Sequence, residues 1–125
     1  MNPAEWLARA ATRGPDAVAF MTGATPTADY RSFARRAQAI GGALRERYGV
    51  SPGDPVAVFM TNRTEYLEAL YGAWWAGAAA VPVNAKLHAK EAAWTVEHAG
   101  ASVVFASDAR RRDSPERIAD IVRGE

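Results

Sequence analysis

The chain has 125 residues, of which 49% are hydrophobic and 23% charged; it contains no cysteine and carries a formal net charge of +1. This length suffices for one domain with a buried core, and the balanced charge gives no electrostatic basis for binding nucleic acid or an anionic membrane. The lack of cysteine excludes disulfides, thiol catalysis and cysteine-ligated metals, and no uncharged apolar run reaches the roughly 20 residues of a membrane span, so we expect a cytoplasmic protein.

The N-terminal part of the chain predicts a helix, a small hairpin and a second helix. Asn2 begins the first helix, because asparagine caps helices and the proline that follows suits the first helical position. Residues 17–22 form a strand-like run, and Gly23 to Pro26 can turn the chain back into a hairpin. Asp29 then caps the second helix, which has a regular apolar stripe.

The rest of the chain alternates between two kinds of pattern. Short apolar runs predict strands over residues 56–60, 79–83 and 102–106, and amphipathic segments predict helices over residues 64–76, 91–99 and 114–122. Strands that alternate with helices at this spacing favour right-handed crossovers and a parallel sheet. We therefore expect an α/β fold: a Rossmann-like parallel sheet with helices on both faces (residues 51–125), preceded by an N-terminal helix, hairpin and capping helix (residues 1–50), as part of a larger domain.

The helix predicted over residues 64–76 carries more large apolar residues than one face can hold. We expect the stripe of Leu67, Leu70, Tyr71 and Trp74 to face the sheet. Adjacent helical residues diverge by about 100°, so Trp75 must meet a second layer, a loop or a partner.

Two segments carry a resemblance to a known family. The first is Thr27 to Phe33, which opens the second helix; the second combines Gly53-Asp54 with the turn-strand-turn Gly77-Ala78-Ala79-Ala80-Val81-Pro82-Val83-Asn84. Together they resemble the first core motifs of adenylate-forming (AMP-binding) enzymes, and Pro-Val-Asn is more typical of the acyl-CoA synthetases, which include the fatty-acid–CoA ligases, than of peptide-synthetase adenylation domains. Asp29 and Ser32 depart from the Thr and Glu usual in the first motif.

The resemblance implies that residues 1–125 are the N-terminal subdomain of a ligase. Such an enzyme condenses a carboxylate with ATP to an acyl-adenylate and then transfers the acyl group to coenzyme A. The family grips ATP with a Ser/Thr/Gly-rich loop ending in Lys; the nearest segment here, Thr22 to Thr27, has no Lys and lies in a predicted hairpin. We therefore expect no catalytic residue, no metal site and no cofactor bound by this chain alone, with ATP, Mg²⁺ and CoA implied for the parent enzyme and the remaining C-terminal portion of the ligase implied as the partner.

Three residues are candidates for binding substrate or cofactor. Ligands approach the carboxyl ends of the strands in a parallel sheet, and Arg63, Asn84 and Lys86 follow two predicted strands. The resemblance implies that Arg63 and Lys86 meet a phosphate of ATP or CoA in an intact enzyme; the alternative is that both are solvated surface charges. For Asn84 the alternative to a ligand-facing role is that its side chain shapes a turn.

A second class of function stays open, namely a free-standing small α/β interaction or regulatory module. A ligase subdomain on its own should leave apolar surface uncovered and self-associate, whereas a complete module should be compact and monomeric. Residues His88 and His98 do not share a metal-ligand spacing, so neither hypothesis includes a metal.

Overall fold

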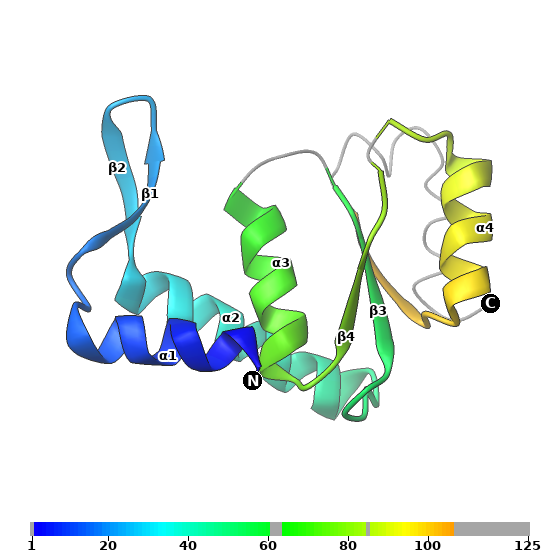
Figure 1. The fold of residues 1–125 in the computed structure, drawn as a ribbon, viewed down its shortest axis with the longest axis horizontal. Helices are drawn as coiled ribbons and strands as arrows, with labels where there is room; N and C mark the ends of the chain where they lie inside the picture. Colours follow the sequence, from blue (N-terminus) through cyan, green and yellow to red (C-terminus); the bar gives the residue numbers. More distant parts are fainter. Residues whose placement is uncertain (1, 61–63, 85, 107–125) are drawn as a thin grey trace.

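A computed structural model describes residues 2–60, 64–84 and 86–106 of the chain (Figure 1). In chain order the elements are α1 (Pro3–Arg13), β1 (Val18–Thr22), β2 (Thr25–Asp29), α2 (Tyr30–Arg47), β3 (Pro55–Phe59), α3 (Thr64–Trp75), β4 (Ala79–Pro82), α4 (Ala89–Ala99) and β5 (Val103–Ala106). The helix predicted over residues 114–122 lies outside the described residues. Within the described ranges, no helix combines the length and the apolar character needed to cross a membrane.

The N-terminal elements form where the local sequence predicts them. The Asn2 side chain accepts the Ala4 backbone N–H at 2.9 Å and so caps α1. Strands β1 and β2 pair antiparallel, with Thr22 opposite Thr25 and a tight turn in which Gly23 has a φ of 62°. Since residues with a side chain rarely adopt this φ, glycine is suited to this position.

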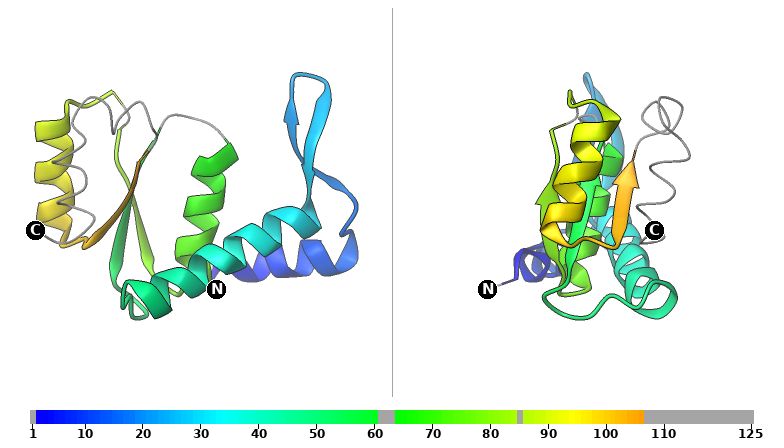
Figure 2. Two further views of the ribbon diagram at one scale, coloured as in Figure 1. Left: turned by 180° about the vertical axis from the view of Figure 1, so that it is seen from behind. Right: turned by 90° about the vertical axis from the view of Figure 1, so that its right-hand side faces the viewer.

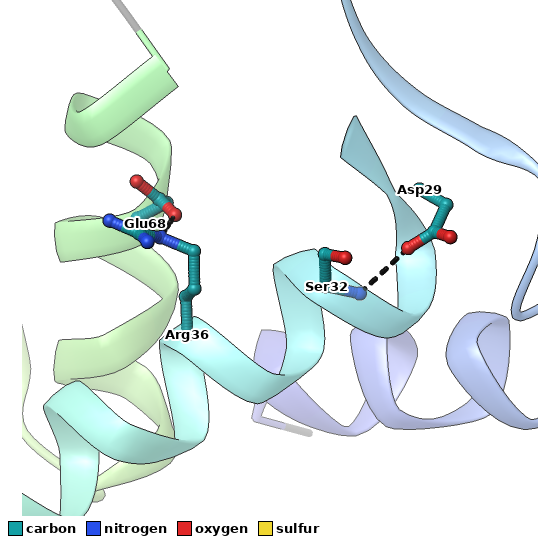
Figure 3. Close-up of polar contacts among 4 residues, drawn as sticks. All are labelled: Asp29, Ser32, Arg36 and Glu68. Atoms are coloured by element: carbon teal, nitrogen blue, oxygen red, sulfur yellow. Dashed lines mark hydrogen bonds and ion pairs between the residues drawn. The ribbon is translucent and has the colours of Figure 1, made fainter. Parts of the chain in front are cut away.

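The second helix begins at the predicted cap. The Asp29 carboxylate accepts the Ser32 backbone N–H at 2.8 Å (Figure 3). This hydrogen bond, followed by that from the Ser32 side chain, lowers the pKa of Asp29 below its ordinary value of 3.8. Serine at this position thus leaves the capping interaction of Asp29 intact, although it stands where the family usually has glutamate.

The cap predicts a pH dependence of stability. Because the folded pKa is the lower one, the contribution of Asp29 is complete well above pH 3.8 and is lost as the pH falls through the folded pKa. We expect urea unfolding between pH 6 and 3 to show a steeper acid loss of stability for the wild type than for Asp29→Asn, whose amide oxygen can still accept the bond but does not titrate. Parallel curves for the two proteins would contradict this assignment.

The three remaining strands form one parallel sheet in the order β4-β3-β5. Strand β3 is central, and its side chains alternate between two layers. Val56 and Val58 pack with residues of α2 and α3, whereas Ala57 and Phe59 pack with Ala92 and Val96 of α4. Helix α3 and helix α4 accordingly cover opposite faces of the sheet (Figures 1 and 2). The prediction of a parallel α/β sheet with helices on both faces is confirmed.

Helices α1 and α2 pack against α3, and the second half of α2 continues to the sheet, where Leu44 joins the cluster of Val56 (Figure 2). Leu7 of α1 and Phe33 of α2 are buried in one cluster, against which Tyr71 and Trp75 of α3 pack. Helices α2 and α3 cross where Gly72 meets Ile40, and a Cβ on Gly72 would lie 2.7 Å from the Ile40 Cβ. This crossing therefore depends on the absence of a side chain at residue 72.

The prediction of which face of α3 is buried was wrong. The buried residues of the helix are Glu68, Ala69, Gly72 and Ala73, whereas Leu67, Leu70, Tyr71 and Trp74 are all partly exposed. Helix α3 packs against the sheet and against the N-terminal helices. Its small residues form the close contacts with these two neighbours, and its large residues lie at the edges of the contacts, partly exposed. Trp75 packs against the cluster formed by α1 and α2, as predicted for a second layer, whereas Trp74 contacts Tyr71 with ring centroids 5.0 Å apart.

The buried carboxylate of α3 has a charged partner. Glu68 is 4% exposed and forms an ion pair with Arg36 of α2 (Figure 3). The Arg36 side chain is largely exposed, so water screens its charge more than it screens that of the glutamate. A charge within the apolar run of α3 is thus accommodated by the neighbouring helix.

Candidate functional site

The carboxyl ends of β3 and β4 lie side by side at one edge of the sheet. Val58 is opposite Pro82, and the Val83 N–H donates to the Val58 carbonyl at 2.9 Å. Asn84 and Lys86 follow directly after this last ladder bond, so the structure places them at the edge where ligands approach parallel sheets. Arg63 lies outside the described residues.

Asn84 shapes the turn that leaves the sheet. Its side-chain oxygen accepts the Lys86 backbone N–H at 2.9 Å, and its carbonyl accepts the Leu87 N–H at 3.1 Å. This is an Asx turn, in which the side chain substitutes for a backbone acceptor. The turn-forming role predicted for Asn84 is confirmed, while its amide nitrogen takes no part in these two bonds.

Lys86 offers a positive charge at the same edge. Its side chain is exposed, and no carboxylate of the described residues forms an ion pair with it. An exposed ammonium can bind an anion such as a phosphate.

Other sequence features fall into structural roles. The segment Thr22 to Thr27, the nearest match to a phosphate-binding loop, is the hairpin turn between β1 and β2, as predicted. His98 stacks on Trp94 of the same helix, with ring centroids 4.9 Å apart. Across the described ranges, no three His, Asp or Glu side chains gather as metal ligands.

The structure adds a feature that the sequence did not predict. A hollow of about 550 Å³ lies between the hairpin and the first turn of α3, and we call it the β1–α3 hollow. Its lining residues are Phe20, Met21, Thr22, Thr64, Glu65, Tyr66 and Leu67. These two groups are more than 40 positions apart in the chain, so no local pattern could reveal that they meet.

Comparisons with known proteins show which family the chain resembles. Residues 7–124 match the sequence profile of the family described as AMP-binding enzyme. A feruloyl-CoA synthase of Amycolatopsis is 37% identical over 100 residues, which cover 80% of this chain and 20% of that protein. An uncharacterized protein of Mycobacterium tuberculosis is 34% identical over 102 residues, which cover 81% of this chain and 58% of that protein.

Solved structures give the same result. The N-terminal domain of FACL13 from Mycobacterium tuberculosis superposes with a TM-score of 0.81 at 28% identity, covering 100% of this chain and 31% of that domain. The chain thus spans about a fifth of the length of the feruloyl-CoA synthase and under a third of the solved domain.

Proposed function

Because the chain belongs to the AMP-binding enzyme family, we propose that it acts as the N-terminal scaffold of an ATP-dependent acyl-CoA synthetase and has no ligase activity by itself. The observation that carries this proposal is the β3-α3-β4 unit, which holds the Gly-Ala-Ala-Ala-Val-Pro-Val-Asn segment and lies within a fold shared along its whole length with the FACL13 domain. The parent reaction would join a carboxylate to ATP, release pyrophosphate and pass the acyl group to CoA.

The described residues do not by themselves fit ATP or Mg²⁺. In the described structure, the only glycine-containing turn that resembles a phosphate loop closes the β1–β2 hairpin. At the carboxyl ends of β3 and β4, the described polar side chains are the Lys86 ammonium and the Asn84 amide. We therefore assign ATP, Mg²⁺ and CoA binding chiefly to the remaining C-terminal portion of the ligase. The role of this chain is to support that portion and to form part of the wall along the acyl or CoA approach.

A pyrophosphate-release assay tests the proposal. We expect the 125-residue chain with ATP, Mg²⁺, CoA and a panel of fatty acids and ferulate to release no pyrophosphate above a protein-free control. The positive control is the complete Mycobacterium tuberculosis fatty acyl CoA synthetase, of which this chain covers 24%. Sustained turnover by the chain alone would overturn the scaffold assignment.

We further propose that Arg63, Asn84 and Lys86 meet a phosphate group of ATP or CoA in an intact ligase. Their effect can be measured in a hybrid ligase, defined as that synthetase with its matched N-terminal segment replaced by this chain. We expect Lys86→Ala to raise the KM for ATP or CoA about tenfold, since a charge-assisted hydrogen bond is worth about 1.5–3 kcal/mol. Lys86→Arg should retain most of the affinity, and Lys90→Ala, an exposed lysine on α4, is the matched control. An unchanged KM in Lys86→Ala would mean that Lys86 is a surface charge.

One observation favours the second candidate, a free-standing interaction or regulatory module. Matches of similar length cover 58% of the uncharacterized relative but only 20% of the feruloyl-CoA synthase, which shows that the uncharacterized relative is far shorter. Light scattering across a concentration series separates the hypotheses: a scaffold without its partner should self-associate through uncovered apolar surface, and a module should stay monomeric.

A further inference from the structure

We propose that the β1–α3 hollow is the docking site for an extended, apolar segment of the ligase chain that lies C-terminal to this part. This inference rests on the proposed function, and it identifies which surface of the scaffold receives the partner. The partner is the remainder of an AMP-binding ligase, whether it is joined to this chain or supplied as a separate one.

The hollow has a mixed lining, and its apolar part is left exposed by the described residues. Met21 is 55% exposed and Leu67 is 37% exposed, although both belong to regular elements. Phe20 and Tyr66 are partly buried and extend the apolar part, whereas Thr22, Thr64 and Glu65 add polar groups to the lining. Clustered apolar side chains around a concave surface are typical of a binding interface rather than of a solvated surface.

The strand beside the hollow has an unpaired edge. Among the described residues β1 pairs only with β2, and β1 is the hairpin strand nearer to α3 (Figure 1). Three consecutive residues of β1 line the hollow, so it runs along this strand, whose pairing with β2 is irregular around Phe20. Such an edge offers backbone N–H and C=O groups to an added strand, and an isolated two-stranded hairpin is only marginally stable.

The comparisons indicate what fills the hollow. The solved FACL13 domain contains the whole of this fold, yet this chain accounts for only 31% of it. In the feruloyl-CoA synthase the matched share is 20%. In the solved FACL13 domain a much larger body of chain therefore accompanies the same hairpin and helix, and it can cover the edge of β1 and the exposed apolar residues of the hollow.

Methionine oxidation provides a direct test, because the chain has one exposed and one buried methionine in the described ranges. Met21 is 55% exposed, whereas Met60 is 8% exposed and serves as the internal standard. In the isolated chain, peroxide should oxidise Met21 much faster than Met60, as read by peptide mass spectrometry. In the hybrid ligase we expect the rate at Met21 to fall by about tenfold or more while Met60 is unchanged, since oxidation follows exposure. Hydrogen exchange over residues 18–22 should slow in parallel.

Substitutions provide the matched energetic test. The pair Met21→Lys and Leu67→Lys should lower the Tm of the hybrid ligase by several degrees or more and leave that of the isolated chain nearly unchanged. Trp94→Lys is the control, because Trp94 is 64% exposed on α4, away from the hollow. If Met21→Lys and Leu67→Lys lowered the Tm of the isolated chain as much as that of the hybrid ligase, the docking proposal would be overturned.

The outcomes separate this proposal from the proposed function. A folded, active hybrid in which Met21 stays reactive overturns the docking site and leaves the scaffold function standing. Protection of Met21 in the isolated chain at a concentration where light scattering shows a monomer would also overturn the proposal, because no partner then covers the hollow. The feruloyl-CoA synthase serves as a second host, and failure of both hybrids to fold with the wild-type chain would count against both the function and the site.

Discussion

Replacing Gly72 by valine is expected to lower the free energy of unfolding by about 3 kcal/mol, because it overpacks the crossing of α2 and α3. A Cβ at this position would lie 2.7 Å from the Ile40 Cβ and nearer still to its Cγ2. Ile40 is branched at Cβ and held in a helix, so it cannot rotate away as the end of a flexible side chain would. Urea unfolding monitored by circular dichroism measures the loss.

Two further variants show whether the loss comes from the helix crossing. Gly42→Ala is the matched control, since a Cβ there meets nothing within 4 Å, and it should raise stability by about 0.5–1 kcal/mol through lower chain entropy in the unfolded state. Adding Ile40→Ala to Gly72→Val should recover part of the lost stability. If Gly72→Val proved as harmless as Gly42→Ala, the close approach of the two helices would be wrong.

The second large effect is expected at Leu7, the residue that anchors α1. Its side chain is fully buried against Phe33, Ala34 and Ala37 of α2. Leu7→Ala removes this contact and leaves a cavity between the helices, which should cost about 3 kcal/mol. Thermal and urea unfolding of the isolated chain measure it.

The control for Leu7 lies two positions away on the same helix. Arg9 is 57% exposed and forms an exposed ion pair with Glu5 at 3.8 Å. Arg9→Ala should change stability by less than about 0.5 kcal/mol. Similar losses for the two variants would show that α1 is held by its helical propensity rather than by burial of Leu7.

Sequence reasoning was most successful where a structure depends on neighbouring residues. The caps at Asn2 and Asp29 were predicted because a short polar side chain satisfies a backbone N–H two or three residues on. Gly100, which ends α4 with a φ of 77°, is the position where a side chain would be strained. The parallel sheet followed from the alternation of strands and helices, and the comparisons support the family resemblance that the motifs carried.

The buried face of α3 could not be predicted in the same way. Large apolar residues surround this helix, so periodicity favoured Leu67 and Trp74, but the two layers that enclose α3 approach it through Gly72 and Ala73. The burial of Glu68 depends on Arg36, which lies 32 positions earlier in the chain. Helix packing and long-range ion pairs depend on which elements become neighbours, and that information is not local.

The candidate site also has one part that was predictable from local sequence and one part that was not. The turn at Asn84 was predictable from one residue type, whereas the β1–α3 hollow required the hairpin and α3 to be placed together. The roles of Arg63 and Lys86 toward a phosphate and a ligand-facing role of Asn84 stay predictions. The residue boundaries 1–50 and 51–125 and a cytoplasmic location also stay predictions.

Pro82 has a consequence for how the outer side of the sheet behaves. Residues of a parallel strand direct their N–H groups to alternate neighbours, and the N–H of Val83 donates inward to β3. The nitrogen of Pro82 therefore belongs to the outward row and carries no hydrogen. A strand of another molecule that paired with the outer edge of β4 would lack one backbone hydrogen bond at Pro82. Proline therefore makes this edge a poor template for amyloid-like pairing.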